Sequence, residues 1–189
     1  NPGGLLQEAI KIVSLFVPKG QLVVSTKSNI EGYNQEFKTT QEPVSLKVPL
    51  VVLINKKSAS ASEIVAGALQ DLDRAVVLGK RSFGKGLVQR PKNLPYGGQL
   101  KVTISKYYTP SGRCIQSIDY GNRGKDGVVN KYQEEDYKAF KTKKGRTVFD
   151  GGGISPDVGS GNKKNSSFID ELLRSDLVFD FAKIRLCLG

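Results

Sequence analysis

The feature that most constrains the fold is the passage from a short apolar run into an amphipathic helix near residue 60. Val51–Ile54 is an apolar run between a proline and an asparagine, which is typical of a buried β-strand. From Ala61 onward apolar residues recur at helical spacing, and Glu63 lies in the first turn, where the helix dipole favours a negative charge. The sequence therefore predicts a strand that turns into a helix, with Ser60 at the junction.

A serine at such a junction is a candidate nucleophile, because the unpaired N–H groups of a helix start can stabilise an oxyanion. The 189-residue sequence contains no histidine, which excludes a Ser-His-Asp triad within this chain. The candidate base is Lys85, which lies between two glycines in the segment Phe83–Val88. A lysine that loses hydration among apolar neighbours such as Phe83 and Val88 has a lowered pKa, and its neutral amine can accept the serine proton.

These residues resemble the carboxyl-terminal processing, or tail-specific, protease family. The segments Ser58–Ile64 and Phe83–Gly86 carry the resemblance, together with Gln89. The lysine follows Ser60 by 25 residues, and the glutamine follows the lysine by four, as in that family. The resemblance implies that Ser60 is the nucleophile, that Lys85 is the general base and that Gln89 positions the lysine.

The resemblance extends to the groups around the reaction centre. The opening Asn1–Leu6 resembles a glycine turn of the family, which implies an oxyanion hole built from the N–H groups of Gly3 and Ala61. The segment Tyr108, Thr109 and Pro110 follows a predicted strand that can pair with an extended peptide, so the resemblance implies substrate contact there. A plain Pro-Gly turn is the alternative interpretation of this segment.

The order of predicted elements favours an α/β fold with a partly parallel sheet. The resemblance implies a layered ClpP/crotonase-like core with a mixed sheet, flanking helices and a β-hairpin segment. The predicted elements are a helix at 3–16, strands at 21–26 and 75–78, a short strand or hairpin before Pro43, a hairpin of 87–91 with 100–108, and a short peripheral amphipathic helix within 121–146. Residues 1–158 are expected to form the protease core, 159–167 a flexible linker and 168–189 a helical segment.

Composition removes several classes of function. The net charge of +11 invites a nucleic-acid partner, but the basic residues are scattered among 18 acidic ones and no nucleic-acid-binding motif occurs, so none is predicted. No apolar stretch is long enough for a membrane span. Gly86 follows Lys85 and strand-like residues come next, which argues against a phosphate-binding loop; no cofactor and no metal site are predicted. Cys114 and Cys187 are either free thiols or one bridge.

The function implied by the resemblance is that of a serine endopeptidase that cleaves protein C-terminal tails through a Ser-Lys dyad assisted by Gln. The alternative is a non-catalytic peptide-binding or scaffold module that keeps the fold and adds a peptide strand to its sheet edge. An acyl hydrolase acting on small substrates is disfavoured, because the G-x-S-x-G elbow is absent around Ser60.

The expected partner is a protein or peptide substrate, a homo-oligomer is left open, and the resemblance implies a periplasmic or cell-envelope location. Family members carry a PDZ domain and a helical region ahead of the catalytic core, and neither is recognisable in these residues. The chain is therefore expected to be a fragment of the catalytic core, with weak or absent cleavage on its own.

Overall fold

The computed structural model describes residues 1–123 and 129–161 and the single positions 171, 175, 177 and 180. The chain divides into two compact units, 1–159 and 160–189, and the account below concerns the first. The helix predicted at 168–189, most of the predicted linker and Cys187 lie outside the described residues. The division into core, linker and helical segment stays a prediction.

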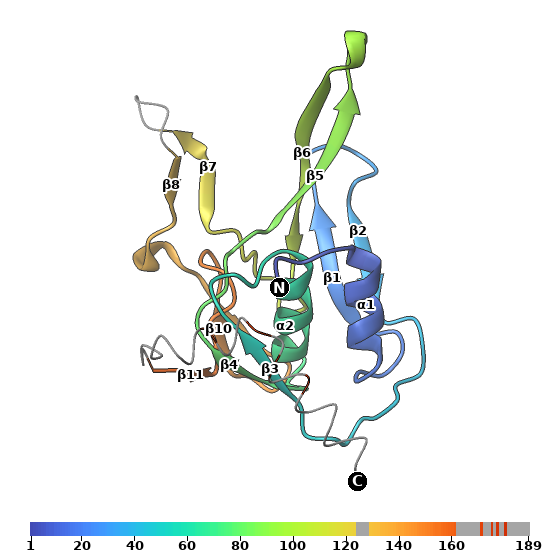
Figure 1. Ribbon diagram of the computed structural model, residues 1–189, viewed down its shortest axis with the longest axis vertical. Coiled ribbons are helices and arrows are strands. Elements are labelled where there is room, and N and C mark those ends of the chain that lie inside the picture. The colour runs from blue at the N-terminus through green and yellow to red at the C-terminus, as the bar shows by residue number, and fades with distance from the viewer. Residues whose placement is uncertain (124–128, 162–170, 172–174, 176, 178–179, 181–189) are drawn as a thin grey trace. The chain divides into compact units, whose positions relative to one another are not determined.

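The first unit combines two helices with an antiparallel and a parallel sheet, which confirms the mixed α/β class (Figure 1). The helices are α1 (Leu6–Ser14) and α2 (Ala61–Asp71). The antiparallel sheet has the order β2-β1-β6-β5, with β1 (Leu22–Lys27), β2 (Gln35–Lys38), β5 (Leu87–Asn93) and β6 (Gln99–Tyr108). The parallel sheet has the order β11-β4-β3, with β3 (Val51–Ile54), β4 (Val76–Gly79) and β11 (Val158–Gly159).

The remaining elements are two hairpins and two short 3-10 turns. One hairpin is β7 (Ile118–Arg123) with β8 (Val129–Lys131), and the other is β9 (Ala139–Lys141) with β10 (Thr147–Phe149). The 3-10 turns are η1 (Pro95–Gly97) and η2 (Glu134–Asp136). The predicted pairing of β5 with β6 is confirmed, and this hairpin projects away from the helices with η1 at its tip (Figure 1).

Helix α2 occupies the centre of the core because almost all of its side chains are buried. It contacts β1 and β4, and α1 packs against it. Apolar side chains of these elements form one cluster that includes Val13, Val24, Ile64, Leu69 and Val77. The helix predicted from residue 3 starts only at Leu6, because the preceding residues run extended beside the start of α2.

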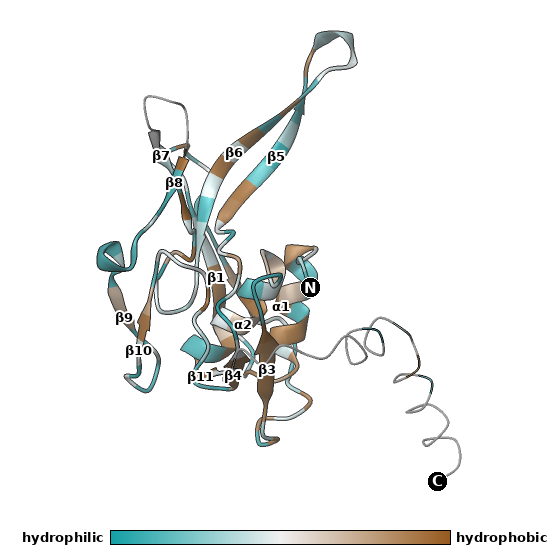
Figure 2. Cartoon of the chain, turned by 60° about the vertical axis from the view of Figure 1, so that its left-hand side comes forward, coloured by the Kyte–Doolittle hydropathy of each residue, from teal (hydrophilic) through white to brown (hydrophobic). Residues whose placement is uncertain are grey.

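The strand predicted at Val51–Ile54 is present, but the prediction that it is buried is wrong. Val51 and Leu53 are 55% and 74% exposed, whereas Ile54 is buried. Alternate side chains of a strand point to opposite faces, and α2 covers only one face of this sheet. Val51, Leu53 and Val76 are therefore exposed in the described part of the chain, although β3 and β4 are hydrophobic strands (Figure 2).

The amphipathic helix predicted within residues 121–146 is wrong as well. Of that range, the described residues form strands, η2 and a turn in which Gly145 has φ +86°. The turn residues Lys143–Gly145, between two short apolar stretches, favour a hairpin. The helix was predicted from the spacing of aromatic residues, which also occurs in hairpins. Most of the described residues of this segment are exposed, as expected of a peripheral segment, and its last residue, Arg146, pairs with Asp73 at 2.6 Å and Asp157 at 2.5 Å.

Two findings bear on the predictions from composition. None of the helices described here has both the length and the hydrophobicity that crossing a membrane requires. Cys114 is a free, mostly buried thiol, and burial raises its pKa, so the thiol stays protonated and poorly reactive.

A fully buried ion pair ties the turn after β6 to the end of α2. Arg113 donates to Asp71 Oδ1 at 2.7 Å and to Gln70 Oε1 at 2.7 Å, and neither member of the ion pair is exposed. Arg113 also donates to the carbonyl of Phe149 at 3.1 Å, and the second Asp71 oxygen accepts from the N–H of Ser111 at 3.1 Å. The pair therefore fixes three chain segments against one another.

We expect Asp71→Asn to lower the free energy of unfolding by about 3–5 kcal/mol, because it leaves the buried Arg113 charge without a counter-ion. Denaturant titration measures the change. Glu8→Gln is the control, since Glu8 and Lys11 form an exposed pair whose loss should change stability by no more than about 0.5 kcal/mol. Equal stability of Asp71→Asn and the parent would contradict the structural role of the pair.

Candidate active site

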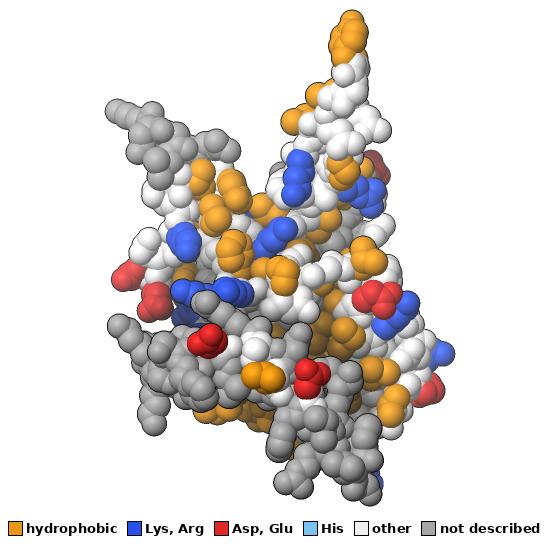
Figure 3. Space-filling model, in the orientation of Figure 1, with side chains coloured by type: hydrophobic (Ala, Val, Ile, Leu, Met, Phe, Trp, Pro, Cys, Tyr) orange, Lys and Arg blue, Asp and Glu red, His pale blue; other side chains and the backbone are white. Residues whose placement is uncertain are grey.

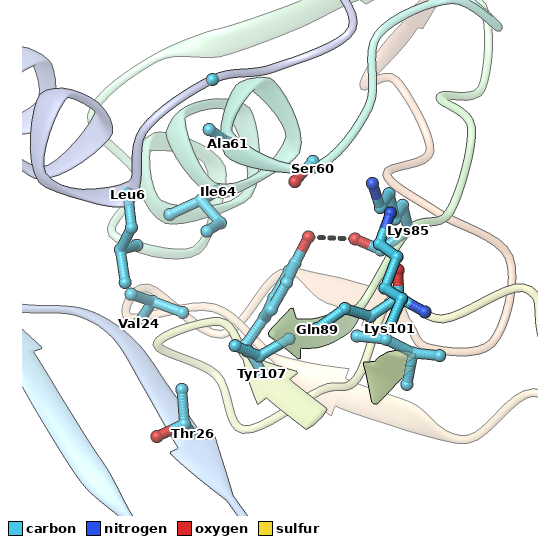
Figure 4. A pocket seen from close by; sticks show the side chains of 13 residues that line it. Leu6, Val24, Thr26, Ser60, Ala61, Ile64, Lys85, Gln89, Lys101 and Tyr107 are labelled. Carbon is cyan, nitrogen blue, oxygen red and sulfur yellow. Dashed lines mark hydrogen bonds between the residues drawn. The ribbon is translucent and has the colours of Figure 1, made fainter. Parts of the chain in front are cut away.

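Ser60 stands directly before α2 in a backbone conformation that non-glycine residues rarely adopt. Its φ is 57° and its ψ is −119°. Such conformations cost about 1–3 kcal/mol and are retained where the surrounding structure holds them, often at functional sites. The conformation places the serine at a sharp turn into the helix, with its side chain on the surface of a cavity (Figure 4).

Glu63 holds this turn in place from inside the protein. Its side chain is 0% exposed, and its Oε2 accepts the N–H of Ser60 at 2.8 Å and the N–H of Lys85 at 2.9 Å. Its Oε1 accepts the hydroxyl of Ser82 at 2.5 Å and the N–H of Gly84 at 2.6 Å. One carboxylate therefore joins the backbone of the candidate nucleophile to the backbone of the candidate base.

The loop that carries Lys85 is also held from the opposite side. The N–H of Gly86 donates to Gln116 Oε1 at 2.8 Å, and the N–H of Ser117 donates to the carbonyl of Gly84 at 2.9 Å. Gly84 has φ +85°, and a Cβ there would lie 2.5 Å from the Cβ of Ser117. Glycine is required at this position both by the backbone angle and by the close approach.

The predicted catalytic residues line one open cavity of about 280 Å³. Ser60, Lys85 and Gln89 all contribute to its wall. In Figure 4 the apolar side chains of Leu6, Val24 and Ile64 lie on one side, and Lys85, Gln89 and Lys101 lie on the other. The cavity therefore joins an apolar surface to a polar, basic one. Figure 3 shows separate Lys and Arg side chains on this face of the protein, below and between the two projecting hairpins.

The surroundings of the lysine differ in part from the expectation. Val88 lines the cavity as expected, but Phe83 is 51% exposed and does not. The amide of Gln89 donates to Thr103 Oγ1 at 3.3 Å on the neighbouring strand. The role of Gln89 in positioning Lys85 stays a prediction.

The glycine turn at the N-terminus lies against the candidate nucleophile. Gly3 has φ +97°, and a Cβ there would lie 2.5 Å from the carbonyl oxygen of Ala59 and 2.9 Å from the N of Ala61. The N–H of Gly3 donates to Asn1 Oδ1 at 2.9 Å, while Gly4 and Ala61 line the cavity. The oxyanion hole predicted from Gly3 and Ala61 stays a prediction.

The predicted substrate-contact segment lies away from the cavity wall. Tyr108 lines a separate cavity of about 340 Å³, and Thr109 is buried, with its N–H donating to the carbonyl of Arg113 at 3.1 Å. Pro110 is half-buried in the same turn. Substrate contact by Tyr108, Thr109 and Pro110 stays a prediction.

Two residues with evident roles in the site were not identified from the sequence. Glu63 was considered only for its effect on the helix dipole, although a glutamate three residues after a serine at a helix start also signals a capping box. Tyr107 lies in the cavity wall, where its neighbour Tyr108 was expected. Strand alternation predicts that only one of two adjacent tyrosines faces the cavity, but the choice depends on the register with β5, which pairs Leu87 with Lys106.

Tyr107 has an altered acidity. Burial raises the pKa of its phenol, the neighbouring Ser60 hydroxyl lowers it, and the charge of Glu63 raises it further. The phenol therefore stays protonated at neutral pH. Within the described residues, no group of three or more Asp, Glu, Cys or His side chains is arranged to hold a metal ion.

Comparison with known proteins defines the class to which this fold and site belong. A model described as Peptidase family S41 matches residues 1–129. The chain is 42% identical over 165 residues to the carboxy-terminal-processing protease of Bartonella bacilliformis, covering 86% of this chain and 37% of that protein. It is 46% identical over 118 residues to the carboxyl-terminal-processing protease of Picosynechococcus sp., covering 62% of this chain and 28% of that protein.

The chain therefore belongs to peptidase family S41, and the resemblance to the carboxyl-terminal processing proteases is confirmed. The solved structure of a photosystem II D1 C-terminal processing protease has a TM-score of 0.62 and 29% identity, covering 85% of this chain and 32% of that chain. This likeness agrees with the layered fold. The chain spans about a third of the length of the relatives that it matches.

We expect Glu63→Gln to destabilise the protein, because an amide cannot accept at both positions that the carboxylate oxygens occupy. Each buried donor left unpaired costs about 1–3 kcal/mol. Denaturant titration measures the loss, with Glu134→Gln, an exposed carboxylate paired with Arg81, as the control that should remain stable. A Glu63→Gln variant as stable as the parent would show that the four bonds are not important for folding.

The two glycines of the N-terminal turn should respond differently to alanine. Gly3→Ala should disturb the Ser60 turn because its Cβ would meet backbone atoms at 2.5 and 2.9 Å, whereas Gly4→Ala has nothing within 4 Å of the added Cβ. We expect Gly3→Ala to lower the melting temperature and Gly4→Ala to leave it nearly unchanged, both measured by thermal unfolding. Equal behaviour of the two variants would contradict the close approach of Gly3 to Ser60.

Proposed function

We propose that this chain acts as a serine endopeptidase that cleaves protein C-terminal tails, with Ser60 as nucleophile, Lys85 as general base and Gln89 positioning the lysine. The observation that carries the proposal is the pairing of Ser60 and Lys85 through Glu63. Their backbone N–H groups bind the same carboxylate oxygen, and their side chains line the same cavity. A nucleophile and its base need such a fixed relation.

The reaction follows from the chemistry of these two side chains. Ser60 Oγ forms a bond to the carbonyl carbon of the substrate while its proton passes to the neutral amine of Lys85. The C–N bond then breaks, and the ammonium of Lys85 returns the proton to the leaving amine. A water molecule attacks the acyl-enzyme with Lys85 again taking a proton, and the proton passes to Ser60 Oγ as the acid product leaves. In this proposal the N–H groups of Gly3 and Ala61 stabilise the oxyanion, which requires the Gly3 N–H to exchange Asn1 Oδ1 for the substrate oxygen.

The substrate in this proposal is an extended polypeptide. Strand β5 lies at the edge of the antiparallel sheet and reaches the cavity through Leu87, Val88 and Gln89. Edge strands can add a peptide strand through their unpaired backbone groups. The apolar side of the cavity favours an apolar substrate side chain next to the cleaved bond. Substrate contact at Tyr108, Thr109 and Pro110, a homo-oligomer and a periplasmic or envelope location belong to the same proposal.

A non-catalytic peptide-binding module remains the second candidate, because the same edge of β5 would bind a peptide without cleaving it. The two candidates differ in their requirement for Ser60. If the protein is an endopeptidase, Ser60→Ala abolishes cleavage. If it is a peptide-binding module, Ser60→Ala leaves peptide binding unchanged and neither protein cleaves the peptide.

The Lys85→Arg variant tests whether Lys85 acts as a base or contributes only a positive charge. A guanidinium cannot become neutral in the working pH range, so we expect Lys85→Arg to be as inactive as Ser60→Ala, with a loss of at least about 100-fold in cleavage rate. A peptide with a fluorescent group before its C-terminal tail provides the measurement, both in this chain and in any longer form that contains it.

Gln89→Ala should reduce the rate less than either substitution if the glutamine only positions the lysine. Glu134→Gln serves as the surface control. Substantial cleavage by a folded Lys85→Arg variant would exclude Lys85 as the base.

A further inference from the structure

The hydroxyl of Tyr107 lies between the candidate nucleophile and the candidate base. Tyr107 is 4% exposed and belongs to β6, and its ring points from that strand toward Ser60 and Lys85 (Figure 4). Its hydroxyl donates a hydrogen bond to the backbone carbonyl of Lys85. In Figure 4 the phenol of Tyr107 points toward the side chain of Ser60, and both residues line the same cavity. The phenol oxygen therefore binds one member of the proposed dyad through its backbone and faces the side chain of the other.

The ring itself has little freedom to move. The backbone N–H of Tyr107 donates to the carbonyl of Gly86 at 3.0 Å, so β6 is bound to the lysine loop next to the residue that the hydroxyl contacts. The N–H of Lys85 is bound to Glu63. The peptide groups on both sides of the Lys85 Cα are thus fixed, one by a carboxylate and the other by a phenol, which limits the direction in which the lysine side chain leaves the backbone.

We propose that Tyr107 is a positioning residue of the Ser60–Lys85 site, whose hydroxyl holds the Lys85 backbone and the Ser60 side chain at a fixed separation. This inference rests on the function proposed above. Glu63 joins the two residues through their N–H groups, and Tyr107 joins them on the cavity side through the serine hydroxyl and the lysine carbonyl. The two links act on different parts of Ser60, because the Glu63 carboxylate binds its backbone N–H and the Tyr107 phenol faces its side chain.

The positioning role requires a neutral hydroxyl, since a phenolate could not donate to the Lys85 carbonyl. The ionisable groups that face Tyr107 are Glu63 from α2, Lys85 from the loop, Lys101 from the same strand and Cys114 beyond it. Burial raises the pKa of the phenol, and the charge of Glu63 acts in the same direction. The phenol therefore remains a hydrogen-bond donor at neutral pH.

The first test is Tyr107→Phe, which removes the hydroxyl and keeps the ring. We expect kcat to fall by about 10- to 100-fold, the range associated with misplaced reacting groups, while KM changes by less than about twofold. Labelling of Ser60 by a fluorophosphonate should slow by a similar factor, because that reaction needs an activated serine and no peptide substrate. Tyr132→Phe is the matched control: it removes a phenol hydroxyl from the separate cavity and should change neither rate.

A second variant covers the case in which Tyr107→Phe does not fold. Replacement of Tyr107 by 3-fluorotyrosine keeps the hydroxyl and the shape but makes the phenol more acidic. We expect near-parental activity at neutral pH and a loss of activity at alkaline pH that begins earlier than in the parent, as the phenol ionises and ceases to donate. A ring that serves only to fill space would give the parental pH profile.

The outcomes distinguish this inference from the proposed function. Cleavage by Ser60→Ala or Lys85→Arg would overturn the proposed function itself. Loss of cleavage in those two variants, combined with parental kcat and labelling rate in Tyr107→Phe, would overturn only the role of Tyr107. The role of Tyr107 would also be overturned if the activity of the fluorotyrosine protein at alkaline pH were identical to that of the parent.

Discussion

The candidate site depends on one buried carboxylate. Glu63 is fully enclosed, yet its two oxygens accept four hydrogen bonds, from Ser60, Ser82, Gly84 and Lys85. Hydrogen bonds to an ionised acceptor are stronger than neutral ones, and a buried charge is tolerated only when it is satisfied in this way. The carboxylate thereby stabilises both the unusual backbone of Ser60 and the glycine loop around Lys85, two segments that neither share an element nor adjoin in sequence.

The glycine-rich segment before β11 extends this network of hydrogen bonds. Ser82, which donates to Glu63, accepts in turn the N–H of Ile154 at 2.6 Å, so the glycine-rich segment before β11 is connected to the same carboxylate. On the other side of the loop, Gln116 and Ser117 bind Gly86 and Gly84, and Arg113 fixes the start of that segment to α2 through Asp71. The base is thus held between two sets of buried polar contacts, while the cavity side stays open to solvent.

Local sequence patterns identified most of the elements. The strand at Val51, the helix from Ala61, the strand near Val76 and the hairpin of β5 and β6 were predicted within a few residues, because their apolar periodicity and turn residues are unambiguous. The helix expected within 121–146 failed because aromatic residues at helical spacing also occur in hairpins, and Gly145 was the better signal. The burial of Val51 and Leu53 failed because coverage of a sheet face is decided by distant parts of a chain.

The sequence by itself determined which side chains could serve as nucleophile and base. The absence of histidine, the serine at the strand-helix junction and the glycine-flanked lysine restricted the possible bases to very few, and the spacing of Ser60, Lys85 and Gln89 indicated the family. Only the tertiary structure decided which groups meet. That Glu63 joins Ser60 to Lys85, and that Tyr107 rather than Tyr108 faces them, follows from strand register and helix docking. These depend on contacts between residues far apart in sequence, which no local pattern of side chains encodes.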